Sequence, residues 1–189
     1  MSSSNRRGAD LEEITAEFDR IVPLDSSTVR RWMMTDDEEA AGALMALLAD
    51  PKHDSRIQPP LRPEEYFEFA RRYYERSMLG NSEGEWVDSA TDAAYDFARW
   101  FKRLWGDPNI PKSAGYNLKK SLERTYLAAP KPIRKNIINS ALEQLFYDPE
   151  ILNYFADWKE NPLLQSAYEE ARESAMARNR IRQKGEASD

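Results

Sequence analysis

The sequence predicts an all-α protein, an irregular bundle of about six to nine helices. Apolar residues recur at three- and four-residue intervals along most of the chain, which is the period of an amphipathic helix. Gly and Pro fall almost entirely between these apolar patterns, where they end one helix and open the next. No run of alternating β-branched residues and no Asn-Gly or Asp-Gly turn indicates a strand or a hairpin.

The length of the chain, 189 residues, suits one domain with a buried core. Residues 1–8 are small, polar and basic, and residues 180–189 are polar with one glycine, so both ends are predicted to be disordered tails. Residues 9–179 are predicted to form a single helical domain. Five Trp residues offer this domain large apolar area to bury.

The first half of the chain carries three long helical patterns and a short one, which Ser26 or Ser27 is predicted to open. Residues 10–22 have apolar positions at helical spacing, the last of them Ile21, before Pro23 ends the pattern. Thr35 with Glu38 three residues later is typical of a capping box and predicts a helix that ends near Leu48. Pro63 suits the first position of a strongly amphipathic helix that ends near Gly80.

Between these helices, residues 52–62 predict a linker or an ordered loop, because the stretch is polar and contains Pro59 and Pro60. His53 is expected to be exposed to solvent in this loop. On the helix from Pro63, Glu68 precedes Arg71 and Arg72 by three and four residues, which indicates ordinary surface ion pairs.

The second half of the chain predicts further helices in close succession. Ser82 with Glu85 is a second capping box, and it opens a helix with Trp86, Phe97 and Phe101 on its apolar face. Residues 113–128 predict the next helix. The widest apolar arc lies between Ile133 and Phe146, so that helix is expected to be the most central one.

Two Asx-Pro pairs, Asp148-Pro149 and Asn161-Pro162, each combine an N-cap residue with a proline suited to the first helical position. They predict two consecutive helices. Over residues 148–172 this spacing resembles the tandem Asp-Pro helices of co-chaperone modules. The resemblance implies binding of exposed apolar segments.

Composition excludes several kinds of chemistry. Without any Cys, the chain has no disulfide, thiolate nucleophile or Cys-ligated metal. Its single His precludes a multi-His metal site, and Ser residues lack the Gly-x-Ser-x-Gly turn of a catalytic nucleophile. No Gly-rich phosphate loop and no long apolar run occurs. We therefore predict no catalytic residue, no cofactor, no metal and no membrane partner, and a cytoplasmic location.

Four carboxylates are predicted to form an acidic stripe on the helix that opens at Ser82. They are Glu85, Asp88, Asp92 and Asp96. Like charges four residues apart destabilise an isolated helix, so such a stripe is typical of a surface that binds a cation or a basic partner. The competing interpretation is a solvated helix face, helped by the favourable position of acids near a helix N-terminus.

A basic segment, residues 112–135, stands out in a chain whose formal net charge is −6. It holds seven Lys and Arg residues and one acid, and its candidate partner-binding residues are Lys112, Tyr116, Lys119, Lys120 and Arg124. Helical spacing places Tyr116 and the lysines away from Leu118, on a side facing solvent or a partner. The competing interpretation is pairing inside the chain with the acidic segments 10–54 and 148–175.

These observations together predict a non-enzymatic protein-interaction module, such as an adaptor, an inhibitor or an immunity-type protein, whose partner is another protein. One alternative is a nucleic-acid-associated protein that uses residues 112–135, although the net negative charge disfavours a polyanion. The other alternative is an enzyme or small-ligand binder with an interior pocket of carboxylates and aromatic side chains.

Overall fold

The computed structural model describes residues 4–80, 84–108 and 110–186, and the fold they form is all-α, as the sequence predicts. The chain divides into two compact units, Met1–Ser89 and Ala90–Asp189. The prediction of one domain over residues 9–179 stays a prediction.

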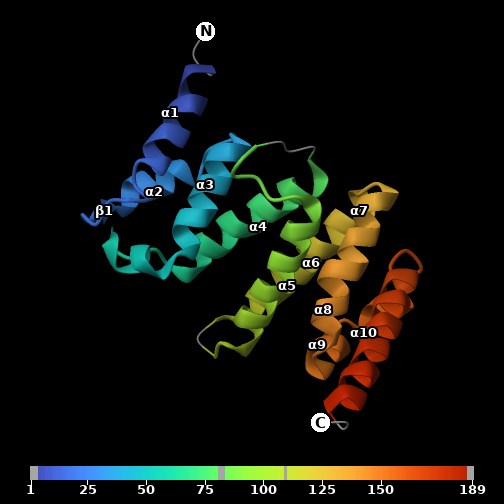
Figure 1. The fold of residues 1–189 in the computed structure, drawn as a ribbon. Coiled ribbons are helices and arrows are strands. Elements are labelled where there is room, and N and C mark those ends of the chain that lie inside the picture. Colours follow the sequence, from blue (N-terminus) through green and yellow to red (C-terminus); the bar gives the residue numbers. More distant parts are fainter. Residues whose placement is uncertain (1–3, 81–83, 109, 187–189) are drawn as a thin grey trace. The chain divides into compact units, whose positions relative to one another are not determined.

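The first unit contains four α-helices, one 3-10 helix and two very short strands in its described part (Figure 1). In chain order these elements are α1 (Ser4–Thr15), β1 (Leu24–Asp25), α2 (Ser26–Trp32), α3 (Glu38–Ala49), η1 (Pro51–Arg56), β2 (Ile57–Gln58) and α4 (Pro63–Leu79). The strands pair in parallel, Leu24 with Ile57 and Asp25 with Gln58. The sequence predicts no strand here, because two residues are too few to show alternation.

Helix starts in the first unit follow the capping rules, with one shift. Pro63 is the first residue of α4, as predicted. Helix α3 begins at Glu38, but its N-cap is Asp37, whose side chain accepts a hydrogen bond from the Ala40 amide at 2.9 Å. Thr35, the predicted cap, accepts from the amide of Asp37 at 3.3 Å instead.

The first helix differs from the prediction at both ends. It ends at Thr15 and turns follow, so Ile21 lies outside the helix and is 91% exposed instead of packing inward. Helix α1 begins at Ser4 and the last helix ends at Glu186, so the structure has helix within both segments predicted as tails. Each further residue of a formed helix gains one backbone hydrogen bond. Residues 1–3 and 187–189 lie outside the described residues.

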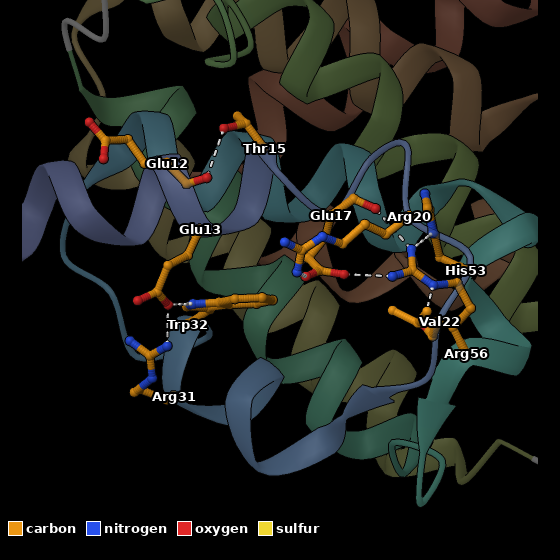
Figure 2. A network of polar contacts seen from close by, with 10 residues as sticks. All are labelled: Glu12, Glu13, Thr15, Glu17, Arg20, Val22, Arg31, Trp32, His53 and Arg56. Carbon is orange, nitrogen blue, oxygen red and sulfur yellow. Dashed lines mark hydrogen bonds and ion pairs between the residues drawn. The ribbon is translucent and has the colours of Figure 1, made fainter.

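A buried polar network holds the end of α1 to η1 (Figure 2). The guanidinium of Arg56 donates to the Glu17 carboxylate at 2.6 Å, to the Glu17 carbonyl at 2.9 Å and to the Val22 carbonyl at 2.9 Å. Its Nη1 also lies 2.6 Å from Nδ1 of His53. The two carbonyls lie after the end of α1, where the Glu17 carbonyl also accepts from the Arg20 amide at 3.2 Å. Arg56 adds side-chain donors to carbonyls that no α-helix orders.

The prediction of an exposed His53 in a loop is wrong, since His53 is 1% exposed. Residues 51–56 coil into η1, which turns His53 and Arg56 inward together. A guanidinium has donors and no acceptor, so Nδ1 of His53 accepts from Arg56, and this contact assigns the ring proton to Nε2. Burial, reinforced by the charges of Arg56 and Lys52, lowers the pKa of His53, while Asp50 and Glu17 oppose that shift.

Three further ion pairs tie α2 to its neighbours. Arg31 pairs with Asp10 at 3.0 Å and with Glu13, whose carboxylate also accepts from the Trp32 indole at 3.0 Å. Arg30 donates to both oxygens of Glu65 on α4, at 2.9 and 3.3 Å. Arg30 and the backbone amide of Arg62 together lower the pKa of Glu65 to about 2.

The second unit consists of helical segments throughout its described part (Figure 1). They are α5 (Ala90–Gly106), α6 (Lys112–Ala128), α7 (Lys131–Asn136), the π-helix η2 (Ile137–Leu142), α8 (Glu143–Phe146), α9 (Pro149–Tyr154), the 3-10 helix η3 (Ala156–Glu160) and α10 (Gln165–Glu186). Segments α7, η2 and α8 are continuous, so residues 131–146 form one rod.

This rod is the centre of the second unit, as predicted. It packs against both α5 and α10, and Ile137, Ala141, Leu142 and Leu145 have no exposed surface. The π-helical turn carries i→i+5 hydrogen bonds, as from the Glu143 amide to the Ile138 carbonyl. Aromatic rings extend the core toward the last helix, with Phe155 5.6 Å from Phe146 and 5.2 Å from Trp158 between centroids.

Asp148-Pro149 caps α9 as predicted, whereas the start predicted at Pro162 is wrong, because α10 begins at Gln165. The Asp148 side chain accepts from the amides of Glu150 and Ile151, at 2.8 and 3.3 Å, and opens α9. The Asn161 side chain accepts from the Leu163 amide at 3.0 Å and leads through one turn into α10. The 3-10 helix η3 separates the two helices.

Helix α5 begins at Ala90 and not near Ser82, so the predicted helix start is wrong. Ser82 lies outside the described residues. Tertiary contacts hold the described part of this segment out of helix: the Trp86 ring stacks on Phe18 at 5.0 Å, and its carbonyl accepts from the Tyr73 hydroxyl at 3.2 Å. The same hydroxyl accepts from the Asp88 amide at 3.0 Å. These bonds replace the helical ones that a local pattern favours.

Gly42 on α3 makes room for this segment, and its replacement tests the packing. A Cβ at Gly42 would lie 1.7 Å from the Trp86 carbonyl oxygen, whereas one at Gly115 on α6 would lie 3.8 Å from the Trp105 ring. We expect Gly42→Ala to lower the free energy of unfolding by about 1–3 kcal/mol through overpacking. Gly115→Ala should raise it by up to about 1 kcal/mol through helix propensity. Urea unfolding followed by Trp fluorescence measures both, and stabilisation by both would contradict this packing.

A second prediction concerns pH. The pKa of His53 is lowered in the folded chain, so the unfolded chain binds more protons below its ordinary pKa of about 6.5. Stability should therefore be complete above that pH and fall as the pH drops toward the folded pKa, by at most about 1.4 kcal/mol per pH unit. His53→Gln keeps an acceptor for Arg56 without titrating, so its free energy of unfolding should be flatter between pH 7 and 5. Equal slopes for the two proteins would refute the assignment.

Candidate functional site

The four carboxylates of the predicted acidic stripe do not share one helix. Glu85 and Asp88 precede α5 and belong to the first unit, while Asp92 and Asp96 lie on α5 in the second. The stripe as predicted is therefore wrong, because it depended on a helix that began at Ser82. Asp96 forms an ion pair with Arg99, one turn along α5.

The predicted partner-binding residues of α6 differ in their exposure to solvent and in their ion pairs. Lys112 and Arg124 are exposed and Tyr116 is 54% exposed, as a partner surface requires. Lys120 pairs with Glu123 at 2.8 Å, which raises the pKa of the lysine. Lys119 is only 6% exposed, so its predicted place on a solvent-facing side is wrong.

Lys119 instead serves as a buried link between α6 and the segment around α9. Its ammonium group donates to the Tyr154 carbonyl at 2.7 Å and pairs with Asp157. It also lies 4.7 and 5.1 Å from the ring centroids of Tyr154 and Phe155. The Asp157 contact is pairing within the chain between the basic segment and the acidic segment 148–175. This supports the competing interpretation of the basic charges.

A hollow in the first unit, here called the α4 groove, has the size of a ligand site, at about 520 Å³. One wall comes from the segment before α3 and its first residue, with Met33, Thr35, Asp36 and Glu38. The other wall is one face of α4, with Phe69, Arg72, Glu75, Arg76, Leu79 and Gly80. Phe69, Arg72, Arg76 and Leu79 follow helical spacing along about 15 Å of the helix axis.

The two arginines of the α4 groove hold its walls together. Arg72 donates from Nη2 to the Met33 carbonyl at 2.9 Å, and Arg76 donates from Nη1 to the Asp36 carbonyl at 3.4 Å. The Nε of each is buried without an acceptor in the described part of the chain. Such a donor costs about 1–3 kcal/mol. Backbone carbonyls fix the guanidinium groups in place but leave their positive charges without a carboxylate.

Arg71, the neighbouring arginine, shows the opposite arrangement. It pairs with Glu68 at 2.5 Å and with Glu75 at 2.6 Å. The predicted surface ion pair of Glu68 thus forms with Arg71, and the one predicted with Arg72 does not. The sequence could not reveal this choice, because Arg71 and Arg72 stand at equally good helical spacing from Glu68.

The apolar part of the α4 groove comes from Phe69, Met33 and Leu79. Phe69 and Met33 are buried, whereas Leu79 is 44% exposed at the end of α4. Met34, beside the lining residue Met33, is 69% exposed. The groove thus combines apolar surface with fixed cations, which is the composition that protein interfaces favour at their centres.

The second unit has a smaller hollow of about 330 Å³, lined by Asp92, Tyr95, Ala98, Arg99, Lys102 and Gln144. It includes Asp92 of the predicted acidic set. Burial lowers the pKa of Lys102, against the opposing charge of Asp148. A buried carboxylate nearby in the rod, Glu143, does not line it; Tyr147 and Arg178 bind that carboxylate at 2.8 and 2.7 Å.

Within the described residues, no group of three or more His, Asp or Glu side chains is placed to hold a metal ion. Among the same residues, every helix is too short or too polar to cross a bilayer. No protein-family model, no curated protein and no solved structure matches the chain.

The altered role of Lys119 yields a stability prediction. Lys119→Ala removes a bond to the Tyr154 carbonyl and two ring contacts, so we expect the free energy of unfolding to fall by about 1–3 kcal/mol. Lys112→Ala, at an exposed position of the same helix, should change it by less than about 0.5 kcal/mol. Urea midpoints measure both variants. Equal midpoints would return Lys119 to the solvent-facing surface that the sequence indicated.

Proposed function

We propose that this chain is a non-enzymatic protein-interaction module, and that it binds its partner protein through the α4 groove. The observation that carries the proposal is the juxtaposition of Phe69, Met33 and Leu79 with two arginines that donate to backbone carbonyls in the part of the chain that the structure describes. Aromatic residues, Met and Arg are the side chains most enriched at protein interfaces.

The fixed geometry of the α4 groove favours binding over mere solvation. Both guanidinium groups are anchored before any partner arrives, so little side-chain entropy remains to be lost on binding. At the edge of the groove, the lining residue Leu79 is 44% exposed. Burying such side chains contributes about 25 cal/mol per Å².

The nucleic-acid alternative loses three of the cations in residues 112–135. Lys119 is buried and Lys120 is paired with Glu123, while Arg134 donates to the carbonyls of Ala129 and Leu127 at 2.8 and 2.9 Å. A phosphate backbone requires cations that remain available at the surface. The enzyme alternative has a buried carboxylate in Glu143, but its bonds with Tyr147 and Arg178 are those of a structural link.

Paired leucine substitutions test the proposal. Leu79→Asn places a polar group on the α4 groove, while Leu163→Asn makes the same change at a leucine that is 67% exposed in the second unit. We expect affinity capture from the native cell, quantified by mass spectrometry, to lose at least one protein with the first variant and none with the second. That protein, once purified, should bind the Leu79 variant at least tenfold more weakly than the unaltered chain.

Thermal melts of both variants provide the control for folding. A full set of captured proteins retained by Leu79→Asn, with an unaltered melt, would show that the α4 groove is not the binding surface.

A further inference from the structure

We propose that the α4 groove takes an extended acidic segment of its partner, with two carboxylates two residues apart and a large apolar side chain beyond each. This inference rests on the proposed function and adds the chemistry of the ligand. It comes from the order of side chains along α4, which is Phe69, Arg72, Arg76, Leu79.

The charges of the two arginines carry the first step. Neither Arg72 nor Arg76 has a carboxylate oxygen within 4 Å among the described residues, although carboxylates line the same groove. Glu75 is committed to Arg71, at 2.6 Å. Glu38 stands in the first turn of α3, where the helix dipole favours its charge. The two guanidinium groups are therefore the unmatched charges of the α4 wall.

The spacing of the arginines carries the second step. Four residues of helix separate Arg72 from Arg76 by about 6 Å along the axis. Side chains on one face of an extended segment recur every two residues, about 6.6–6.8 Å apart. Carboxylates at positions i and i+2 of such a segment thus meet one guanidinium each. A guanidinium binds a planar carboxylate through two parallel N–H donors.

The ends of the groove fix the flanking residues. Phe69 and Met33 lie on the Arg72 side, since Arg72 bonds the Met33 carbonyl, and Leu79 lies beyond Arg76. Apolar side chains on the two outer positions of the segment would cover these residues. The groove therefore fits a segment of about seven residues in which every second side chain faces α4. In order, these side chains are apolar, acidic, acidic and apolar.

The opposite wall argues for separate carboxylates and against a phosphate group. Asp36 and Glu38 line that wall and repel any anionic group that faces them. The carboxylates of an extended segment can all lie on the face toward α4, whereas the charge of a phosphate group or a polyanionic backbone is not confined to one face. In an extended segment the residue between the two carboxylates points to this wall, where a neutral or basic side chain fits. The ligand is therefore a protein segment with alternating character, not a nucleic acid.

A display library of random heptapeptides, selected on the full-length protein, tests the inference. We expect enrichment of Asp or Glu at two positions separated by one residue, with Leu, Ile, Phe or Met at the outer positions. A selected peptide with both acids changed to the corresponding amides should bind at least tenfold more weakly. Arg76→Gln should produce a similar loss, and the matched control Arg99→Gln, on α5 in the other unit, should produce none.

The outcomes separate the inference from the proposed function. Peptides that depend on Leu79 but show no acidic preference, or that bind Arg76→Gln and Arg72→Gln at full strength, would overturn the carboxylate ligand and leave the groove as a protein-binding site. Peptides rich in Lys and Arg, or displaced by 10 mM inorganic phosphate, would also overturn it. Selection of no peptide sensitive to Leu79→Asn would overturn both.

Discussion

Arginine side chains that donate to backbone carbonyls are the interaction on which the first unit depends. Segments between short helices expose carbonyl groups that have no helical partner, and such groups are costly when they are buried. Arg56 donates hydrogen bonds to the carbonyls of Glu17 and Val22, and Arg72 donates one to the carbonyl of Met33. A guanidinium has five donors in a rigid plane, so one side chain can join three segments in this way.

The same constraint explains why the α4 groove exists. The chain from Met33 to Asp36 is held to α4 through two polar side chains, Arg72 and Arg76, instead of through close apolar packing. Long arginine side chains keep the backbone segments apart and leave open space between the walls. In the second unit the rod of α7, η2 and α8 is covered by apolar contact with α5 and α10, and its hollow is smaller. Polar anchoring thus creates both the cations and the cavity beside them.

The sequence predicted most of the fold, because the residues that begin and end helices act on their immediate neighbours in the chain. Capping acts within one helical turn, so it is the same in any tertiary setting. Examples are Pro63 at the start of α4 and the side-chain bonds of Asp148 and Asn161 beside their prolines. The failures share the opposite property. The segment before α5 follows Tyr73 and Gly42 instead of its own helical pattern, and Ile21 is exposed because α1 stops two turns early. Long-range contacts of this kind override local propensity.

The candidate site was missed for a related physical reason. The high density of Lys and Arg in residues 112–135 predicted a binding surface there. The number of cations in a segment does not show which of them already have partners within the fold. Lys119 donates to the Tyr154 carbonyl and pairs with Asp157, and Lys120 pairs with Glu123. Arg72 gave no such signal, since an acid at ideal helical spacing suggested that it was paired. Arg72 is left without this carboxylate because both oxygens of Glu68 accept hydrogen bonds from Arg71. A binding charge in a chain this rich in ions is one that the fold leaves unpaired, and that is a property of geometry and not of composition.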